Sequence, residues 1–175
     1  QAISDNGGII KGFNAKGGAK FSRKDIEEEF TGYAAVFGAK GLAWMKVSEA
    51  GLESNIVKFF DDAQQAELKK RLNAEPGDLL LFVADKPKVT NDALANLRIK
   101  VAQRLDIVDP DKMNLLWVVD FPLFEYNEDE KRWDAVHHPF TAPKAEDIPL
   151  LDTDIGSVRS DSYDVVMNGV ELGGG

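Results

Sequence analysis

Cysteine is missing from the 175 residues, histidine occurs only twice, and no apolar run approaches the length of a membrane helix. Without cysteine the chain cannot be a disulfide-stabilised scaffold and cannot hold zinc through thiolates. A membrane-spanning helix needs about 20 largely apolar residues, and no such stretch is present. We therefore expect a cytoplasmic protein, in which the 43% of hydrophobic residues build an ordinary core.

The excess of acidic residues is confined to one part of the chain. Residues 1–117 contain 17 Lys and Arg against 17 Asp and Glu, whereas residues 118–175 contain 4 against 13. The whole net charge of −9 therefore belongs to the last third. Such an asymmetry indicates a domain boundary, and it argues against unaided phosphate-backbone binding by the acidic part. An acidic, solvated surface is the simpler alternative.

Residues 1–116 have the pattern of one unit that mixes helices and strands. Short apolar stretches predict strands, and segments with apolar residues every three or four positions predict helices. Ser22 and Thr90 are suitable N-caps for two of these helices. Because the elements follow one another without long crossovers, we expect a two-layer α+β unit with helices on one face of a mainly antiparallel sheet. The expected strands are 9–13, 42–47 and 79–84, with 56–60 as a further candidate, and the expected helices are 23–37, 61–72 and 90–105.

Residues 117–175 are expected to be β-rich. A long strand-like stretch runs from Leu115 to Tyr126, although Pro122 within it indicates a bulge or a sheet edge. A polar turn and a second strand-like stretch, residues 132–138, follow. Residues 139–161 have loop composition, and a last strand-like segment begins at Tyr163. These strands look like part of a larger antiparallel sheet.

Asn168-Gly169 between apolar residues predicts a two-residue β-hairpin turn. With that turn, Val166 pairs with Glu171 and Asp164 pairs with Gly173. Alternation then places Asp164 and Glu171 on one face, about 7–8 Å apart. Two such carboxylates could share a magnesium ion, because Mg²⁺ is commonly held by one or two carboxylates together with substrate phosphates. An exposed acidic hairpin without a ligand is the alternative.

His137 and His138 are adjacent at the end of a predicted strand. Neighbouring strand residues point to opposite faces, so one imidazole can face a pocket while the other packs. A protonated imidazole could pair with the carboxylate of a substrate. A strand-end pair satisfied by backbone contacts is the alternative. The basic clusters 69–71 and 86–88 are expected to be solvated helix faces, and Trp44, Trp117 and Trp133 are expected in the core.

Five segments together resemble the bacterial-type aspartyl-tRNA synthetases, a family of class II synthetases. They are Phe37–Trp44, Gly77–Asp85, Leu116–Tyr126, His137–Pro143 and Asn168–Gly175. The resemblance implies that residues 1–116 are a GAD-type insertion domain. It also implies that residues 117–175 are β-strands of the class II catalytic sheet, which agrees with the position of the charge asymmetry.

The resemblance also implies roles for the candidate site residues. His137, with His138 beside it, would contact the aspartate substrate. Glu171 and Asp164 would bind ATP and hold Mg²⁺. The family reaction activates aspartate with ATP to aspartyl-adenylate and transfers the aspartyl group to the 3′ end of tRNA. The partners implied are aspartate, ATP and tRNA, with a homodimeric enzyme and no membrane.

We expect the 175 residues to be a fragment of such a ligase that is inactive alone, with no complete catalytic set. The resemblance places the arginines that would bind the ATP phosphates and the aspartate side chain outside these residues. The alternative is a free-standing GAD-type module that binds tRNA or a partner protein, as in a subunit of the tRNA-dependent amidotransferase. A lone module would have no use for His137 or for the Asp164 and Glu171 pair.

Overall fold

The computed structural model describes residues 7–175, and the chain divides at Val108–Asp109 into an N-terminal and a C-terminal unit. Each unit has its own sheets and is described by itself. The assignment of residues 1–116 and 117–175 to an insertion and a catalytic domain stays a prediction, since its boundary falls within a strand of the C-terminal unit. In the described part of the chain, no helix has both the length and the apolar character needed to cross a bilayer.

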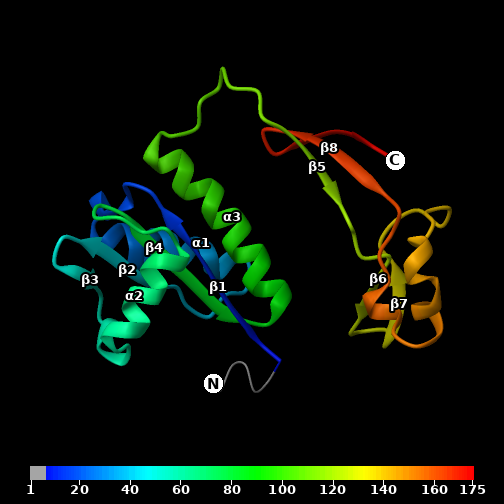
Figure 1. Ribbon diagram of the computed structural model, residues 1–175, viewed down its shortest axis with the longest axis horizontal. Coiled ribbons are helices and arrows are strands. Elements are labelled where there is room, and N and C mark those ends of the chain that lie inside the picture. The colour runs from blue at the N-terminus through cyan, green and yellow to red at the C-terminus, as the bar shows by residue number, and fades with distance from the viewer. Residues whose placement is uncertain (1–6) are drawn as a thin grey trace. The chain divides into compact units, whose positions relative to one another are not determined.

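An antiparallel sheet with strand order β1-β4-β2-β3 forms the centre of the N-terminal unit (Figure 1). Leu81 in the central strand β4 pairs with Phe13 on one side and Trp44 on the other. The predicted α+β class and antiparallel sheet are confirmed. The strands are β1 (Ile9–Ala15), β2 (Ala43–Ser48), β3 (Gly51–Glu53) and β4 (Leu79–Asp85). The helices are α1 (Thr31–Val36), α2 (Asp62–Arg71) and α3 (Pro87–Leu105), with short helical turns η2 (Gly18–Lys20), η3 (Asp25–Phe30) and η4 (Val57–Phe59).

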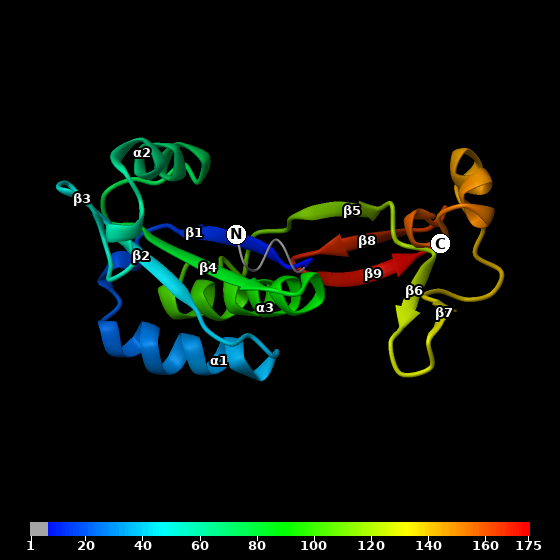
Figure 2. The ribbon, with the colours of Figure 1, turned by 90° about the horizontal axis from the view of Figure 1, so that it is seen from below.

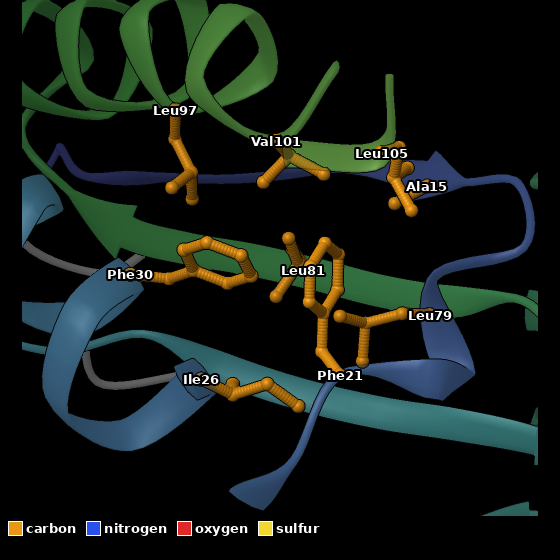
Figure 3. Packing of buried hydrophobic residues seen from close by; sticks show 9 residues of the cluster. All are labelled: Ala15, Phe21, Ile26, Phe30, Leu79, Leu81, Leu97, Val101 and Leu105. Carbon is orange, nitrogen blue, oxygen red and sulfur yellow. The ribbon is translucent and has the colours of Figure 1, made fainter. Parts of the chain in front are cut away.

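The main core lies between one face of this sheet and the helices α3 and η3–α1. Three α3 side chains at helical spacing, Leu97, Val101 and Leu105, point toward the sheet (Figure 3). Phe30 is fully buried there and meets Phe21 edge-on, with 4.9 Å between the ring centroids. Burying a large apolar side chain stabilises a fold by about 1.5–3 kcal/mol, so this cluster is the main stabilising feature of the unit.

The opposite face of the sheet is covered in part by α2, so the helices do not all lie on one face as expected (Figure 2). Leu80 and Met45 alternate with the residues of the main core and are fully buried under this second layer. Leu68 and Leu72 pack against them from the α2 side. The continuous apolar run of β4 explains this arrangement, because a strand covered on both faces needs no polar alternation.

Two local predictions in this unit are wrong. Residues 56–60 form the helical turn η4 instead of a strand. Thr90 is not an N-cap, because α3 begins at Pro87, and proline is favoured at the first helical position, where an N–H is not required. The hydroxyl of the buried Thr90 instead accepts a hydrogen bond from the backbone N–H of Asp85, at 3.1 Å. By contrast, Ser22 is an N-cap as predicted, because its Oγ accepts a hydrogen bond from the backbone N–H of Asp25 at 3.1 Å. The backbone N–H of Ser22 donates in return to Asp25 Oδ2 at 2.8 Å, which completes a capping box.

The C-terminal unit contains a three-stranded antiparallel sheet of order β5-β8-β9 and a separate hairpin, β6–β7 (Figures 1 and 2). The stretch from Leu115 to Tyr126 is two strands instead of one. Asp120 between them has a left-handed backbone, with φ of 62°, and Pro122 pairs only through an isolated bridge to Arg159. The elements are β5 (Leu115–Val119), β6 (Phe124–Asn127), β7 (Arg132–Ala135), η5 (Ala145–Asp152), η6 (Ile155–Ser157), β8 (Tyr163–Met167) and β9 (Val170–Gly174).

Apolar burial differs strongly between the two units. Among the residues of 109–175, only Leu123 and Val158 are buried hydrophobic side chains. Trp117 in β5 is 64% exposed, so its expected place in the core is wrong, and Trp133 is also exposed. Trp44 is partly buried against the main core, as expected. The three-stranded sheet therefore has apolar faces that nothing within residues 109–175 covers.

We expect backbone amides of the 175-residue chain to exchange with solvent much faster in residues 115–174 than in β4 and α3. Local opening is easiest where few apolar side chains are buried. Hydrogen–deuterium exchange resolved by peptide or by residue would measure the difference. Protection of β5 and β8 equal to that of β4 would contradict this expectation.

Candidate functional site

The candidate site residues from the sequence all lie in the C-terminal unit, and two of them flank the β8–β9 turn. Asn168 and Gly169 both have positive φ, 50° and 84°, as a type I′ turn requires. Val166 pairs with Glu171 and Met167 with Val170, so the predicted hairpin and its first pairs are confirmed. The side-chain amide of Asn168 donates to Lys112 O at 2.8 Å, which fixes the turn beside the start of β5.

Farther along the hairpin the predicted register is wrong by one residue. Asp164 pairs with Gly174 instead of Gly173, because β9 has a bulge between Glu171 and Gly173. Asp164 and Val166 are two residues apart in β8, and Val166 pairs with Glu171, so alternation still assigns Asp164 and Glu171 to one face. The bulge alters which glycine lies beside the Asp164 carboxylate.

Gly174 has no side chain, and the Asp164 carboxylate occupies the space that a side chain there would fill. A Cβ atom at residue 174 would lie 2.5 Å from Asp164 Oδ1 and 2.8 Å from the carbonyl oxygen of Tyr163. A Cβ atom at Gly173 would meet nothing within 4 Å. Only glycine therefore fits opposite Asp164 without moving the carboxylate, and the two neighbouring glycines are not equivalent.

The two carboxylates offer oxygen ligands but no complete metal site. Asp164 is half-buried and Glu171 is exposed. Across residues 7–175 no group of three or more His, Asp or Glu side chains could hold a metal ion. A hard cation bound by this pair would need its remaining ligands from water or from a phosphate.

The two histidines have different surroundings. The His137 ring meets Phe121 edge-on at 5.2 Å, and its Nε2 atom is buried without a hydrogen-bond partner among the described residues. His138 is exposed, and its Nδ1 atom accepts a hydrogen bond from the backbone N–H of Phe140 at 3.3 Å. Within residues 7–175 no hydrogen bond or ring contact joins either histidine to Asp164 or Glu171. His137 thus has a polar atom that a ligand could satisfy.

A charged cluster that the sequence did not predict lies in the same C-terminal unit, around Arg159 and Asp147. Arg159 binds the buried Asp147 through two atoms of its guanidinium group, Nε to Oδ2 at 2.7 Å and Nη2 to Oδ1 at 2.9 Å. The hydrogen bonds from Arg159 lower the pKa of Asp147 to about 2. Lys144 forms a short ion pair with Asp120, and this contact holds the pKa of Asp120 below its usual value. Residues 139–161 have loop composition, and no spacing rule pairs an arginine with an acid twelve positions away.

The N-terminal unit has a cavity of about 920 Å³ beside the sheet, with a mainly apolar lining. Phe60, Leu72 and Phe82 contribute to this lining, and the cations Lys11, Lys40 and Arg71 also line the cavity. The polar residues of this unit serve the fold, as with the buried Asp78, which accepts hydrogen bonds from Asn14, Gly17 and Glu75.

Comparison with known proteins gives two findings. Residues 1–94 match the family model of the GAD domain. Nearly the whole chain is also similar to aspartate–tRNA ligases. It is 60% identical to the aspartate–tRNA(Asp/Asn) ligase of Brachyspira hyodysenteriae over 98% of this chain. It is 55% identical to that of Heliobacterium modesticaldum over 99%, and 53% identical to the aspartate–tRNA ligase of Lysinibacillus sphaericus over 95%. The chain spans 28% to 29% of the length of these relatives.

Proposed function

Because the chain belongs to the GAD domain family, we propose that it is the part of an aspartate–tRNA ligase that contains the GAD domain and one wall of the catalytic site. The enzyme would activate aspartate with ATP, forming aspartyl-adenylate and pyrophosphate. It would then transfer the aspartyl group to the 3′ end of tRNA. We further propose that it works in the cytoplasm as a homodimer.

The observation that carries this proposal is the extent of the similarity. The GAD match ends at residue 94, yet 98% of the chain aligns with a ligase at 60% identity. The aligned part therefore includes the C-terminal unit with His137 and the Asp164 and Glu171 pair. A free-standing GAD module would need neither, so this observation favours the ligase over the module.

His137 is the residue proposed to contact the substrate aspartate, with His138 beside it. The buried Nε2 atom of His137 has no partner among the described residues, and an unsatisfied buried polar group costs about 1–3 kcal/mol. A substrate carboxylate that accepts a hydrogen bond from this atom would remove that cost. The edge-on contact with Phe121 limits the rotation of the ring and so fixes its orientation.

Asp164 and Glu171 are the residues proposed to hold Mg²⁺ with the phosphates of ATP. Their oxygen atoms suit magnesium, which keeps several water or phosphate ligands when protein carboxylates bind it. Because Gly174 has no side chain, the Asp164 carboxylate has room beside it, and this agrees with a role as a magnesium ligand. The bound ion would neutralise phosphate charge. The pairing of β8 with β9 would hold the two carboxylates, and therefore the ion, in position.

Gly174→Ala in the complete ligase is expected to raise the Mg²⁺ concentration needed for half-maximal aspartate activation by about tenfold, because the added Cβ displaces the Asp164 carboxylate. Titration of the initial rate with Mg²⁺ at saturating aspartate measures this. Gly173→Ala is the matched control, since its Cβ meets nothing, and it should leave the Mg²⁺ dependence nearly unchanged. Equal effects of the two variants would exclude a specific role for the space at Gly174.

The proposed function is tested by aspartate-dependent exchange of pyrophosphate into ATP, measured on the complete protein that carries this chain. We expect exchange with aspartate and none with glutamate. The 175 residues alone should show no exchange, because they span only 28% to 29% of the ligases they resemble. Absence of aspartate-dependent exchange from the complete protein would overturn the proposal.

A further inference from the structure

A two-atom ion pair in the C-terminal unit joins Arg159 to Asp147. Besides the two guanidinium contacts, the backbone N–H of Arg159 donates to Asp147 Oδ2 at 3.0 Å. Asp147 is 5% exposed, and its own N–H donates to Lys144 O at 2.9 Å. A bidentate arginine–carboxylate pair fixes the geometry as well as supplying energy. The pair therefore locks the helical turn η5 onto the segment around residue 159.

That segment in turn holds the backbone of Phe121. The N–H of Ser160 donates to Phe121 O at 2.8 Å, and the N–H of Leu123 donates to Val158 O at 2.9 Å. Pro122 and Arg159 form an antiparallel bridge between these two contacts. The segment from Phe121 to Leu123 is thus anchored by the residues on each side of Arg159, and the Phe121 ring meets His137.

The residue before Phe121 is held by the same cluster. Asp120 has a left-handed backbone, a conformation that is costly for residues other than glycine, asparagine and aspartate. Its carboxylate pairs with Lys144 and lies 3.6 Å from Arg159 Nη1. The cations Lys144 and Arg159 therefore hold the side chain of the residue next to Phe121.

We propose that Arg159 and Asp147 are positioning residues for the substrate site, which hold His137 in place through the backbone and ring of Phe121. The expected effect on aspartate binding rests on the proposed function, since His137 is the group proposed to contact aspartate. The positioning itself is a property of residues 120–160. Disturbing the pair should therefore move His137 and weaken the binding of aspartate, while the binding of ATP, proposed to depend on Asp164 and Glu171, should change little.

The first test is made on the 175-residue chain, in which His137 and His138 are the only histidines. Asp147→Asn removes the charge from the buried partner of Arg159 at almost constant volume. We expect the imidazole NMR signals of His137 to shift or broaden, while those of His138 move less. Glu146→Gln is the matched control, because exposed Glu146 also accepts from Arg159, at 3.2 Å, and should have little effect. Unchanged His137 signals in Asp147→Asn would overturn the positioning.

Arg159→Lys is the second variant, in case Asp147→Asn prevents the unit from folding. It keeps the charge but cannot form the two-atom contact with Asp147. Amide signals of the β6–β7 hairpin report whether the unit is folded in either variant. His137 signals that stay in place in folded Arg159→Lys would also overturn the proposal.

The second test uses the complete ligase. Asp147→Asn is expected to raise the KM for aspartate by about tenfold, with kcat and the KM for ATP nearly unchanged, because His137 contacts only the amino acid. A general loss of folding would instead lower activity without separating the two substrates. If the His137 signals move but the KM for aspartate does not, the positioning stands and the role of His137 in aspartate binding is overturned. Equal changes of both KM values would contradict the inference.

Discussion

Glu171→Gln in the proposed complete ligase is expected to lower the rate of aspartate activation by about 100-fold, while the affinity for tRNA stays nearly unchanged. Glutamine keeps the shape of the side chain but removes the charge proposed to hold magnesium with ATP. A metal ion bound to the phosphate oxygens supplies several kcal/mol of charge stabilisation to the transition state of adenylyl transfer, and about 1.4 kcal/mol corresponds to a factor of ten in rate. Pyrophosphate exchange and tRNA binding by filter retention measure the two quantities.

Glu128→Gln is the control for this experiment. Glu128 is an exposed acid in the turn of the β6–β7 hairpin, in the same acidic unit, so its replacement changes the net charge equally. It should leave pyrophosphate exchange unchanged. If Glu171→Gln weakens tRNA binding as much as it slows activation, the proposed role of Glu171 in ATP binding is wrong. If both variants slow activation equally, the effect is one of overall charge.

The β8–β9 hairpin shows how far the sequence could predict the candidate site. Asn168-Gly169 specifies its turn chemically, because both residues tolerate positive φ, and the pairs next to the turn follow directly. The bulge beyond Glu171 could not be predicted. It depends on how β9 adapts to β8, and a row of three glycines gives no side-chain pattern that would fix the register.

The predictions that failed elsewhere depended on contacts that residue types and periodicity do not specify. Thr90 has the residue type of an N-cap, but the helix begins earlier, at Pro87. The Thr90 hydroxyl instead accepts a hydrogen bond from the backbone N–H of Asp85. The sequence could not show that α2 covers the second face of the sheet, since a fully apolar β4 is compatible with helices on one face or on both faces. The Arg159–Asp147 pair is brought together by bridges between three irregular segments, and irregular segments have no periodicity from which a contact can be predicted.

Asp78→Asn should lower the free energy of unfolding of the N-terminal unit by about 2–3 kcal/mol near neutral pH. The carboxylate is 4% exposed and accepts hydrogen bonds from Asn14 at 2.8 Å, Glu75 N at 3.0 Å and Gly17 N at 3.0 Å. An asparagine has one acceptor oxygen, so its amide would face at least one of these donors. Urea denaturation of the 175-residue chain, followed by Trp44 fluorescence in a Trp117→Phe, Trp133→Phe background, measures the change. Glu75→Gln is the matched control, because Glu75 is the exposed partner of the same Lys16.

The stability of the N-terminal unit at acid pH should depend on the ionisation of Asp78. Burial alone would raise the pKa of its carboxyl, but the hydrogen bonds from Asn14, Glu75 and Gly17, together with Lys16, outweigh burial and lower the pKa to about 2. A carboxyl with a lowered pKa in the folded state stabilises the fold above its ordinary pKa of 3.8, and this contribution is lost as the pH falls toward 2. The free energy of unfolding of the unsubstituted chain should therefore fall by about 2 kcal/mol more between pH 4 and pH 2 than that of Asp78→Asn. Parallel stability curves for the two chains over this range would show that Asp78 is not the group responsible.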